Sequence, residues 1–289
     1  MKKTILQQLF LWPFILVTSL VYAADGKLLA TAGLTQVEGS GGGGIVPWAT
    51  LSGYDSQEQV SVSAFNTHVS VDDYQLNVIG LATSFYDRVE FSIARQTFDL
   101  PNSVIGLGLG DEINQTIYGL KTRLYGDVIY SQFPQLSFGI QYKKLSDGAI
   151  AGAIGAAENQ QGVDYYLAAT KVHLGAVNGY NLVWNLTARA TKANQMGLLG
   201  FGSQPKQDHQ LVFEASLGVL LSRNLAIGVE YRQKPDNLAA FKEDNWKDIF
   251  ITYIPNKHFN ITLAYADLGN IAVADKQQGI YVSTTGYLW

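Results

Sequence analysis

Residues 180–189 read Tyr-Asn-Leu-Val-Trp-Asn-Leu-Thr-Ala-Arg, and this stretch decides the class of fold. Its strongly apolar side chains recur at every second position, while polar ones such as Asn185 and Arg189 fall mostly between them. A period of two places the apolar residues on one face of a β-strand and the polar residues on the other. The stretch therefore predicts a strand with one apolar and one polar face.

The same alternation recurs along the chain and predicts an all-β protein. We expect fourteen strands, near residues 26–37, 46–54, 58–70, 74–85, 88–98, 113–125, 134–145, 162–173, 180–192, 209–222, 224–234, 246–254, 258–267 and 279–288. The alternation is weak or shifted in the third, fourth, sixth and twelfth of these, so twelve or sixteen strands also fit. Short and long connections between the strands mostly alternate, as in an antiparallel up-and-down barrel with tight periplasmic turns.

The strands of a soluble β-sandwich also alternate between apolar and polar residues. Three further features favour a transmembrane barrel. The strands run about 10 to 13 residues, which is long for a soluble sheet and suits a tilted membrane span. Tyrosine and tryptophan gather near strand ends, as interfacial girdles require. The polar faces carry charges at mid-strand, which a polar lumen would accept. These candidate lumen-lining residues are Glu90, Arg95, Lys121, Arg123, Lys143, Asp164, Arg189, Glu214, Glu230 and Arg232.

Composition excludes several other classes of protein. Charged residues make up only 15% of the chain, whereas soluble proteins carry about 25%, and an apolar content of 47% is too high for a disordered chain. The chain has no cysteine, so disulfide scaffolds, thiolate metal sites and cysteine nucleophiles are excluded. A formal net charge of −4 argues against a nucleic-acid partner.

The N-terminus has the pattern of an export signal. Lys2 and Lys3 precede an apolar run over residues 9–20, and Val21-Tyr22-Ala23 then supplies small-residue cleavage chemistry. The run is too short for a helical anchor, which needs about 20 apolar residues. We therefore expect a cleaved signal peptide over residues 1–23, a barrel over residues 24–289, and residence in the outer membrane of a Gram-negative bacterium.

The C-terminus resembles that of other outer-membrane barrels, which end in a strand with an aromatic last residue. Tyr287 and Trp289 fit this pattern, with tryptophan in place of the more usual phenylalanine. The resemblance implies that the two residues are an assembly signal, with the barrel-assembly machinery and the outer-membrane lipid as partners.

Further motifs resemble one uncharacterised family of Gram-negative outer-membrane proteins, a family known as a domain of unknown function. These motifs are residues 33–39, the following glycine run with Val46-Pro47-Trp48, and the segments 85–90, 234–237, 246–248, 255–258 and 264–270. The resemblance covers essentially the whole mature chain. It implies a barrel, and it brings neither an established activity nor a site.

A passive pore for a small solute is the leading function that we expect. We expect the apolar, glycine-rich outer loops at 104–110, 149–157 and 196–202 to fold over or into the mouth and to form an apolar vestibule for a hydrophobic solute, because exposed apolar surface tends to mark a binding or membrane site. Loops that rest on the lipid interface are the alternative. A structural barrel with a plugged lumen is an alternative, and the glycine run 39–44 fits either an outer loop or a segment packed against the lumen wall.

A membrane-embedded lipid hydrolase is the third alternative. Acyl transfer would need a nucleophile beside a base, and the four scattered histidines, His68, His173, His209 and His258, have no evident serine partner. We therefore expect no enzyme, no cofactor and no metal.

Overall fold

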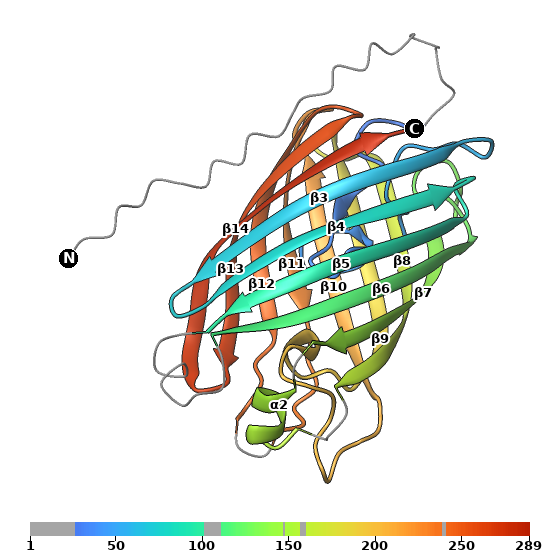
Figure 1. Cartoon of the computed structure of the whole chain (residues 1–289). Coiled ribbons are helices and arrows are strands. Elements are labelled where there is room, and N and C mark those ends of the chain that lie inside the picture. Colours follow the sequence, from blue (N-terminus) through green and yellow to red (C-terminus); the bar gives the residue numbers. More distant parts are fainter. Residues whose placement is uncertain (1–26, 101–110, 147, 157–159, 239–240) are drawn as a thin grey trace.

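The computed structural model describes residues 27–100, 111–146, 148–156, 160–238 and 241–289. Within these residues the strands β3 to β14 form one closed antiparallel barrel of twelve strands. Each strand pairs with its sequence neighbours, and β14 pairs with β3 to close the wall (Figure 1). The predicted signal peptide 1–23 lies outside the described residues.

The wall strands have the following bounds. They are β3 (Val60–Val71), β4 (Gln75–Phe85), β5 (Val89–Asp99), β6 (Glu112–Tyr125), β7 (Gln135–Leu145), β8 (Gln161–Val177), β9 (Tyr180–Thr191), β10 (Gln210–Leu220), β11 (Leu225–Arg232), β12 (Trp246–Asn256), β13 (Phe259–Ile271) and β14 (Ala274–Leu288). Two short strands, β1 (Leu34–Thr35) and β2 (Gly41–Gly42), pair only with each other.

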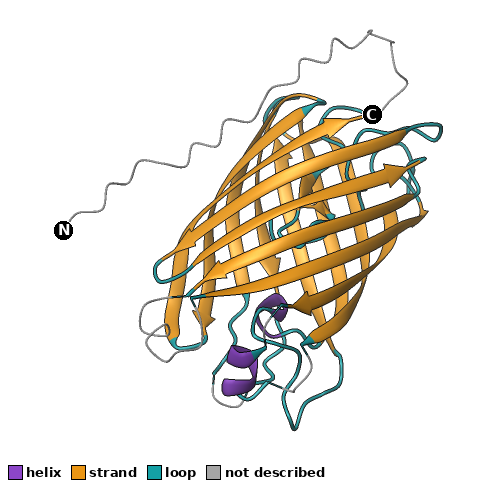
Figure 2. Cartoon of the chain, viewed as in Figure 1, coloured by secondary structure: helices purple, strands orange, loops and turns teal. Residues whose placement is uncertain are grey.

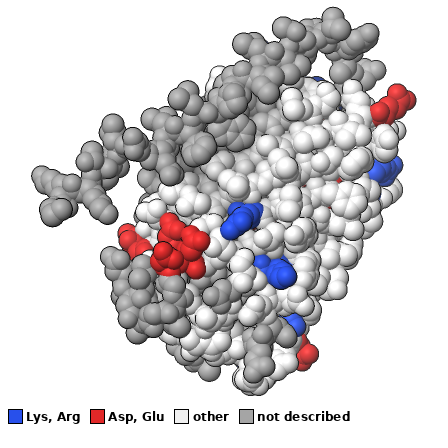
Figure 3. All heavy atoms as spheres, viewed as in Figure 1, with Lys and Arg blue, Asp and Glu red and all other residues white. Residues whose placement is uncertain are grey.

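Period-two alternation decides which side chains face outwards. On β10, Leu211, Phe213 and Leu217 are exposed, whereas Val212, Glu214 and Ser216 between them are buried inside the barrel. The outward faces are dominated by large apolar side chains, and the visible face of the molecule carries few charges (Figure 3). An apolar exterior around a polar interior is the arrangement that a barrel in lipid requires.

The two ends of the barrel differ in their connections. At one end, uppermost in Figure 1 with the C-terminus, most connections are short turns, as at residues 86–88 and 178–179, and residues 126–134 form a longer one. At the other end lie long connections, such as 146–160 and 192–209, and all of the helical turns (Figure 2). Tight turns mark the periplasmic end of outer-membrane barrels, so we call the two ends the short-turn rim and the long-loop rim.

In the parts of the chain that the structure describes, no helix has the length and apolar character needed to cross a membrane.

The first two of the fourteen predicted strands are wrong. Residues 26–37 and 46–54 do not join the wall, because residues 32–55 fold back inside the barrel, where every one of them is buried. Pro47 cannot donate a ladder hydrogen bond, and Gly33, Gly39 and Gly53 take positive φ angles that break an extended strand. We call residues 32–55 the plug.

A second segment fills the lumen from the opposite end. Residues 193–203, which we call the cap, follow β9, contain the short helix η1 (Asn194–Gly197), and are all buried. The helix α2 (Ala149–Ala153) packs on the cap, because a Cβ on Gly200 would come within 3.0 Å of the Ala151 side chain. Of the three predicted apolar loops, 196–202 thus folds into the mouth, 149–156 lies against it, and 104–110 falls outside the described residues.

Candidate functional site

The wall holds the plug mainly through the backbone of the plug. Lys121 Nζ on β6 donates to the carbonyl oxygens of Gly41 at 2.6 Å and Thr50 at 2.8 Å. Glu90 on β5 accepts from the N–H groups of Gly41 and Ser52, at 3.1 and 2.6 Å. Glu90 and Lys121 also pair with each other at 3.4 Å. One buried ion pair therefore holds the plug backbone at two places, at Gly41 and again at residues 50–52.

Glu230 on β11 forms a second clamp on the other side of the lumen. Its carboxylate accepts the N–H groups of Gly44 and Ile45, at 2.7 and 2.8 Å, and the indole N–H of Trp48 at 3.3 Å. A Cβ at Gly43 would lie 1.8 Å from Glu230 Oε1, so a side chain at this position of the glycine run would force the Glu230 carboxylate to move. The glycine run therefore packs directly against this second clamp.

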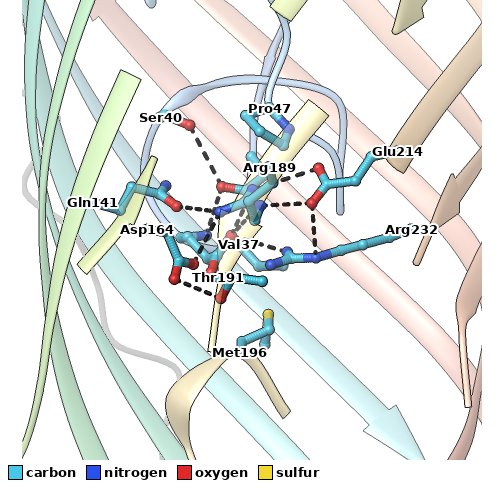
Figure 4. A network of polar contacts seen from close by, with 12 residues as sticks. Val37, Ser40, Pro47, Gln141, Asp164, Arg189, Thr191, Met196, Glu214 and Arg232 are labelled. Carbon is cyan, nitrogen blue, oxygen red and sulfur yellow. Dashed lines mark hydrogen bonds and ion pairs between the residues drawn. The ribbon is translucent and has the colours of Figure 1, made fainter. Parts of the chain in front are cut away.

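Glu38 of the plug belongs to a buried network of six charges. Figure 4 labels four of them, Asp164, Arg189, Glu214 and Arg232. Arg232 Nη1 lies 2.9 Å and Arg189 Nη2 lies 3.4 Å from Glu38 Oε2, and Lys143 Nζ pairs with Glu38 Oε1. The other two acids complete the network: Asp164 lies 2.6 Å from Lys143, and Glu214 lies 2.6 Å from Arg189. All six side chains are at most 4% exposed, so each charge depends on its partners.

Nine of the ten candidate lumen residues point into the barrel, and eight of them are buried there. These are Glu90, Lys121, Lys143, Asp164, Arg189, Glu214, Glu230 and Arg232. The ninth, Arg123, lies at the short-turn rim, where it pairs with Asp87 and, at 3.2 Å, with Asp127.

Arg95 is the exception and corrects the expectation from sequence. It is exposed on the outer face of β5, and its guanidinium lies 3.5 Å from Asn114 Oδ1. Arg95 stands five residues after Glu90 on the same strand, and an odd separation puts two side chains on opposite faces of a strand. Glu90 faces the lumen, so Arg95 cannot.

Both ends of the plug are fastened at the short-turn rim. Lys27, shortly before the plug, lies 2.8 Å from Asp87 and 3.5 Å from Asp55, the last residue of the plug. Asp55 Oδ2 in turn accepts the Asp87 N–H at 2.8 Å. The plug is therefore a hairpin that enters and leaves the barrel through the same opening.

The plug and the cap meet in the lumen. Lys143 Nζ contacts Glu38 of the plug and donates to the backbone oxygen of Met196 in the cap at 3.1 Å. The cap is also clamped at Gln195, whose N–H donates to Glu243 at 3.0 Å and whose side-chain oxygen accepts from Lys234 at 2.6 Å. Gln195 has a positive φ of 44°, a strained conformation that these contacts hold.

An apolar chamber lies where the plug, the cap and the wall meet. Val37 and Ile45 of the plug and Met196 of the cap face it, with Trp246 and Tyr281 on the wall. The free volume is about 30 Å³, which is room for one molecule of the size of water. Trp246 also lies under two cations, with Arg232 5.6 Å and Lys234 4.8 Å from its ring centre. The chamber thus adjoins the charged network.

Glu38 is the functional residue that the sequence analysis missed. The sequence predicts it to lie in the connection between the expected strands 26–37 and 46–54. One signal could have revealed it, because Glu38 is the only charged residue between Lys27 and Asp55. A single acid in an otherwise uncharged stretch needs a partner if that stretch is buried.

The four histidines lie apart in the structure. His68 bonds Asn77 at 2.7 Å, His173 bonds Trp184 at 3.0 Å, and His209 bonds the Val163 carbonyl at 2.7 Å. His258 stacks on Trp289. In the described part of the chain, no group of three acidic or histidine side chains is arranged to hold a metal ion.

The C-terminal aromatic residues lie against the entrance of the plug. Tyr287 faces inwards, is buried, and packs edge-on against Tyr54 with ring centres 5.4 Å apart. Trp289 lies 5.6 Å from the same Tyr54 ring and 4.4 Å from that of His258. In the finished barrel both residues therefore support the short-turn rim.

Comparison with known proteins agrees with the barrel. Residues 31–285 match the family described as a protein of unknown function (DUF3034), which confirms the family resemblance inferred from sequence. No curated protein sequence matches the chain. The fold is similar to that of the KdgM porin, with a TM-score of 0.50, 11% identity, and 78% of this chain and 98% of the porin covered.

Two other solved barrels are similar at slightly lower scores. The NanC porin has a TM-score of 0.49 and 9% identity, with 79% of this chain and 100% of the porin covered. Omp33 of Acinetobacter baumannii has a TM-score of 0.45 and 10% identity, with 81% and 100% covered. The likeness to the KdgM porin, at 11% identity, shows the fold alone, and it bears out the all-β antiparallel barrel.

Proposed function

This chain belongs to the DUF3034 family of proteins of unknown function, and we propose that it is a gated outer-membrane channel for a small apolar solute. The plug and the cap close the lumen in the state described here. In the open state the plug withdraws towards the short-turn rim and the cap shifts from the mouth. The channel is passive and carries no catalytic step.

One observation carries this proposal: the plug shares no strand pairing with the wall. Among the described residues, β1 and β2 pair only with each other, and no plug residue takes part in the wall ladder. Wall side chains such as Lys121 and Glu230 bind the plug backbone instead. Withdrawal of the hairpin would therefore leave all twelve strands paired around a polar lumen.

The apolar chamber supports the choice of solute. A cavity walled by Val37, Met196 and Trp246 favours apolar groups, and its small free volume means that a solute enters only when the cap shifts. The cap is a suitable element to move, because its tip is strained at Gln195 and Met196, with φ angles of 44° and 63°.

Location and assembly complete the proposal. The apolar exterior supports residence in outer-membrane lipid, with export directed by residues 1–23 and final assembly by the barrel-assembly machinery acting on Tyr287 and Trp289. N-terminal sequencing of the mature protein tests the export step, and we expect it to begin at Ala24 or Asp25.

Disulfide locking of the plug tests the gate, because the chain has no native cysteine. Ser52 of the plug and Ser63 of β3 have their hydroxyl oxygens 2.6 Å apart, and those of Thr35 and Thr285 of β14 are 3.1 Å apart. We expect Ser52→Cys/Ser63→Cys and Thr35→Cys/Thr285→Cys, when oxidised, to abolish the ion current through planar lipid bilayers. Reduction should restore the current in the same membrane.

The single-cysteine variants are the matched controls, and their current should not respond to oxidant. If the oxidised double variants conduct like the reduced ones, the plug is not the gate. If the double variants conduct in neither state while a variant that lacks residues 33–53 does conduct, the plug is a permanent filling and the protein is a structural barrel.

A further inference from the structure

Glu38 is held as a bound carboxylate ligand would be held. Lys143, Arg189 and Arg232 converge on its two oxygens from β7, β9 and β11, three different wall strands. The Gln36 side-chain amide also donates to Glu38 Oε2 at 2.6 Å. Cations that meet from separate strands on one carboxylate form a pocket for an anion, and the chain fills this pocket with its own side chain.

The charge balance of the wall points the same way. The wall contributes three cations to the network, Lys143, Arg189 and Arg232, but only two carboxylates, Asp164 and Glu214. The wall residues of this network therefore carry one excess positive charge, and Glu38 of the plug neutralises it. When the plug withdraws, Arg232 loses its closest acidic partner, which leaves a site in need of one negative charge.

The apolar chamber lies next to this pocket. Val37 precedes Glu38 in the plug and lines the chamber, and the Trp246 ring of the chamber wall also contacts the Arg232 guanidinium. Met196 contributes to the chamber lining, and its carbonyl oxygen accepts from Lys143. The open lumen would thus offer a cationic pocket and an apolar surface side by side.

We propose that the solute is an amphipathic monocarboxylate, whose carboxylate takes the place of Glu38 and whose apolar body lies along the Trp246 side of the lumen. This inference rests on the proposed channel function and names its substrate class. Glu38 is then an internal competitor, and the solute opens its own path by displacing the plug from Lys143, Arg189 and Arg232.

Binding of octanoate to the full-length mature protein in nanodiscs tests the assignment, with octanamide as the neutral probe of the same length. Glu38→Gln removes the competing charge and keeps the side-chain size. We expect octanoate to bind this variant on the order of tenfold more tightly than the wild type, with octanamide unchanged. Adding Arg232→Gln should cancel the gain, whereas Arg95→Gln on the outer face should leave it intact.

A second measurement does not depend on the folding of the Glu38 variant. In the Ser52→Cys/Ser63→Cys protein, octanoate should slow the formation of the disulfide severalfold by drawing the plug from the wall, and octanamide should not. Equal effects of octanoate and octanamide in both measurements would overturn the carboxylate assignment. If potassium chloride currents still responded to disulfide locking of the plug, the plug would remain the gate although the solute is not a carboxylate.

Discussion

Glu38 and Lys143 form a buried ion pair although they are separated by 105 positions in the sequence. The same ammonium lies 2.6 Å from Asp164 and 3.1 Å from the carbonyl oxygen of Met196. Lys143 therefore joins the plug, the wall and the cap at one point.

Replacing Lys143 should destabilise the closed barrel strongly. Lys143→Met removes one of the two cations that Glu38 and Asp164 share, the other being Arg189, and breaking a buried pair by removing one partner costs about 3–5 kcal/mol. Urea unfolding in lipid vesicles, followed by tryptophan fluorescence, measures the loss. The neighbouring Lys144 is exposed, so Lys144→Met should change the free energy of unfolding by less than about 0.5 kcal/mol. Equal effects of the two substitutions would contradict the role of the network.

A methyl group on Gly42 should loosen the plug. The added Cβ would lie 2.5 Å from the Val46 carbonyl oxygen and 2.9 Å from Pro47 Cα, both of them backbone atoms of the plug itself. We expect Gly42→Ala to raise the open probability in bilayer recordings several-fold. Gly152→Ala is the matched control, since nothing lies within 4 Å of the added atom there. A closed, wild-type record from Gly42→Ala would contradict the proposed packing of the plug.

Acid should favour the closed cap through Glu243. Burial raises the pKa of this carboxyl to about 7 and outweighs the opposing effect of Lys234, while nearby Asp236 adds to the rise. The carboxyl would have its ordinary pKa, near 4.5, once exposed in an open cap. Because the closed state binds the proton more tightly, closure gains stability as pH falls from 7 towards 4.5 and loses it as pH rises through 7.

Bilayer recordings at pH 5 and pH 8 measure this effect. We expect a lower open probability at pH 5 in the wild type and a much weaker dependence in Glu243→Gln. Glu112→Gln alters an exposed acid on β6 and should keep the wild-type profile. An open probability that rises at pH 5 would reverse the assigned sign.

A charge introduced on the outer face should lower the free energy of unfolding, and the loss should be larger the deeper the residue lies in the membrane. Leu186, at the middle of β9, is 58% exposed, and Leu211, near the long-loop rim on β10, is 64% exposed. Leu186→Arg should lower the free energy of unfolding from lipid by about 2–4 kcal/mol and Leu211→Arg by about 0–1 kcal/mol. Similar losses at both positions would contradict a membrane around this belt.

The wall could be predicted from sequence because lipid and lumen impose opposite demands on alternate residues. Twelve of the predicted segments correspond to β3 through β14, including 180–192, which is β9 (Tyr180–Thr191). The plug could not be predicted in the same way. Its alternation near Leu34 and Trp48 imitates a wall strand, while its glycines and Pro47 serve close packing inside the lumen.

The network of charges was harder to predict from the sequence than the plug. Parity alone decides which charges face inwards, and it would have excluded Arg95. Which charges meet depends on how the strands are staggered around the barrel and on a plug that crosses the lumen. Glu38 reaches Arg232, far along the chain, only because both conditions hold.

The plug touches both strands at which the barrel closes. Thr35 bonds Thr285 on β14, and Ser52 bonds Ser63 on β3, while Thr67 and Ser283 of the same two strands bond each other across 216 positions of sequence. The segment that fills the lumen thus also connects the two strands, β3 and β14, whose pairing closes the wall. Because the plug is joined directly to β3, it can fold on that strand first and then offer Thr35 to β14 when the last strand arrives. It follows that a chain without this segment would have to pair β3 with β14 without these contacts. Such a chain would insert into the membrane more slowly, even if the assembled barrel were stable.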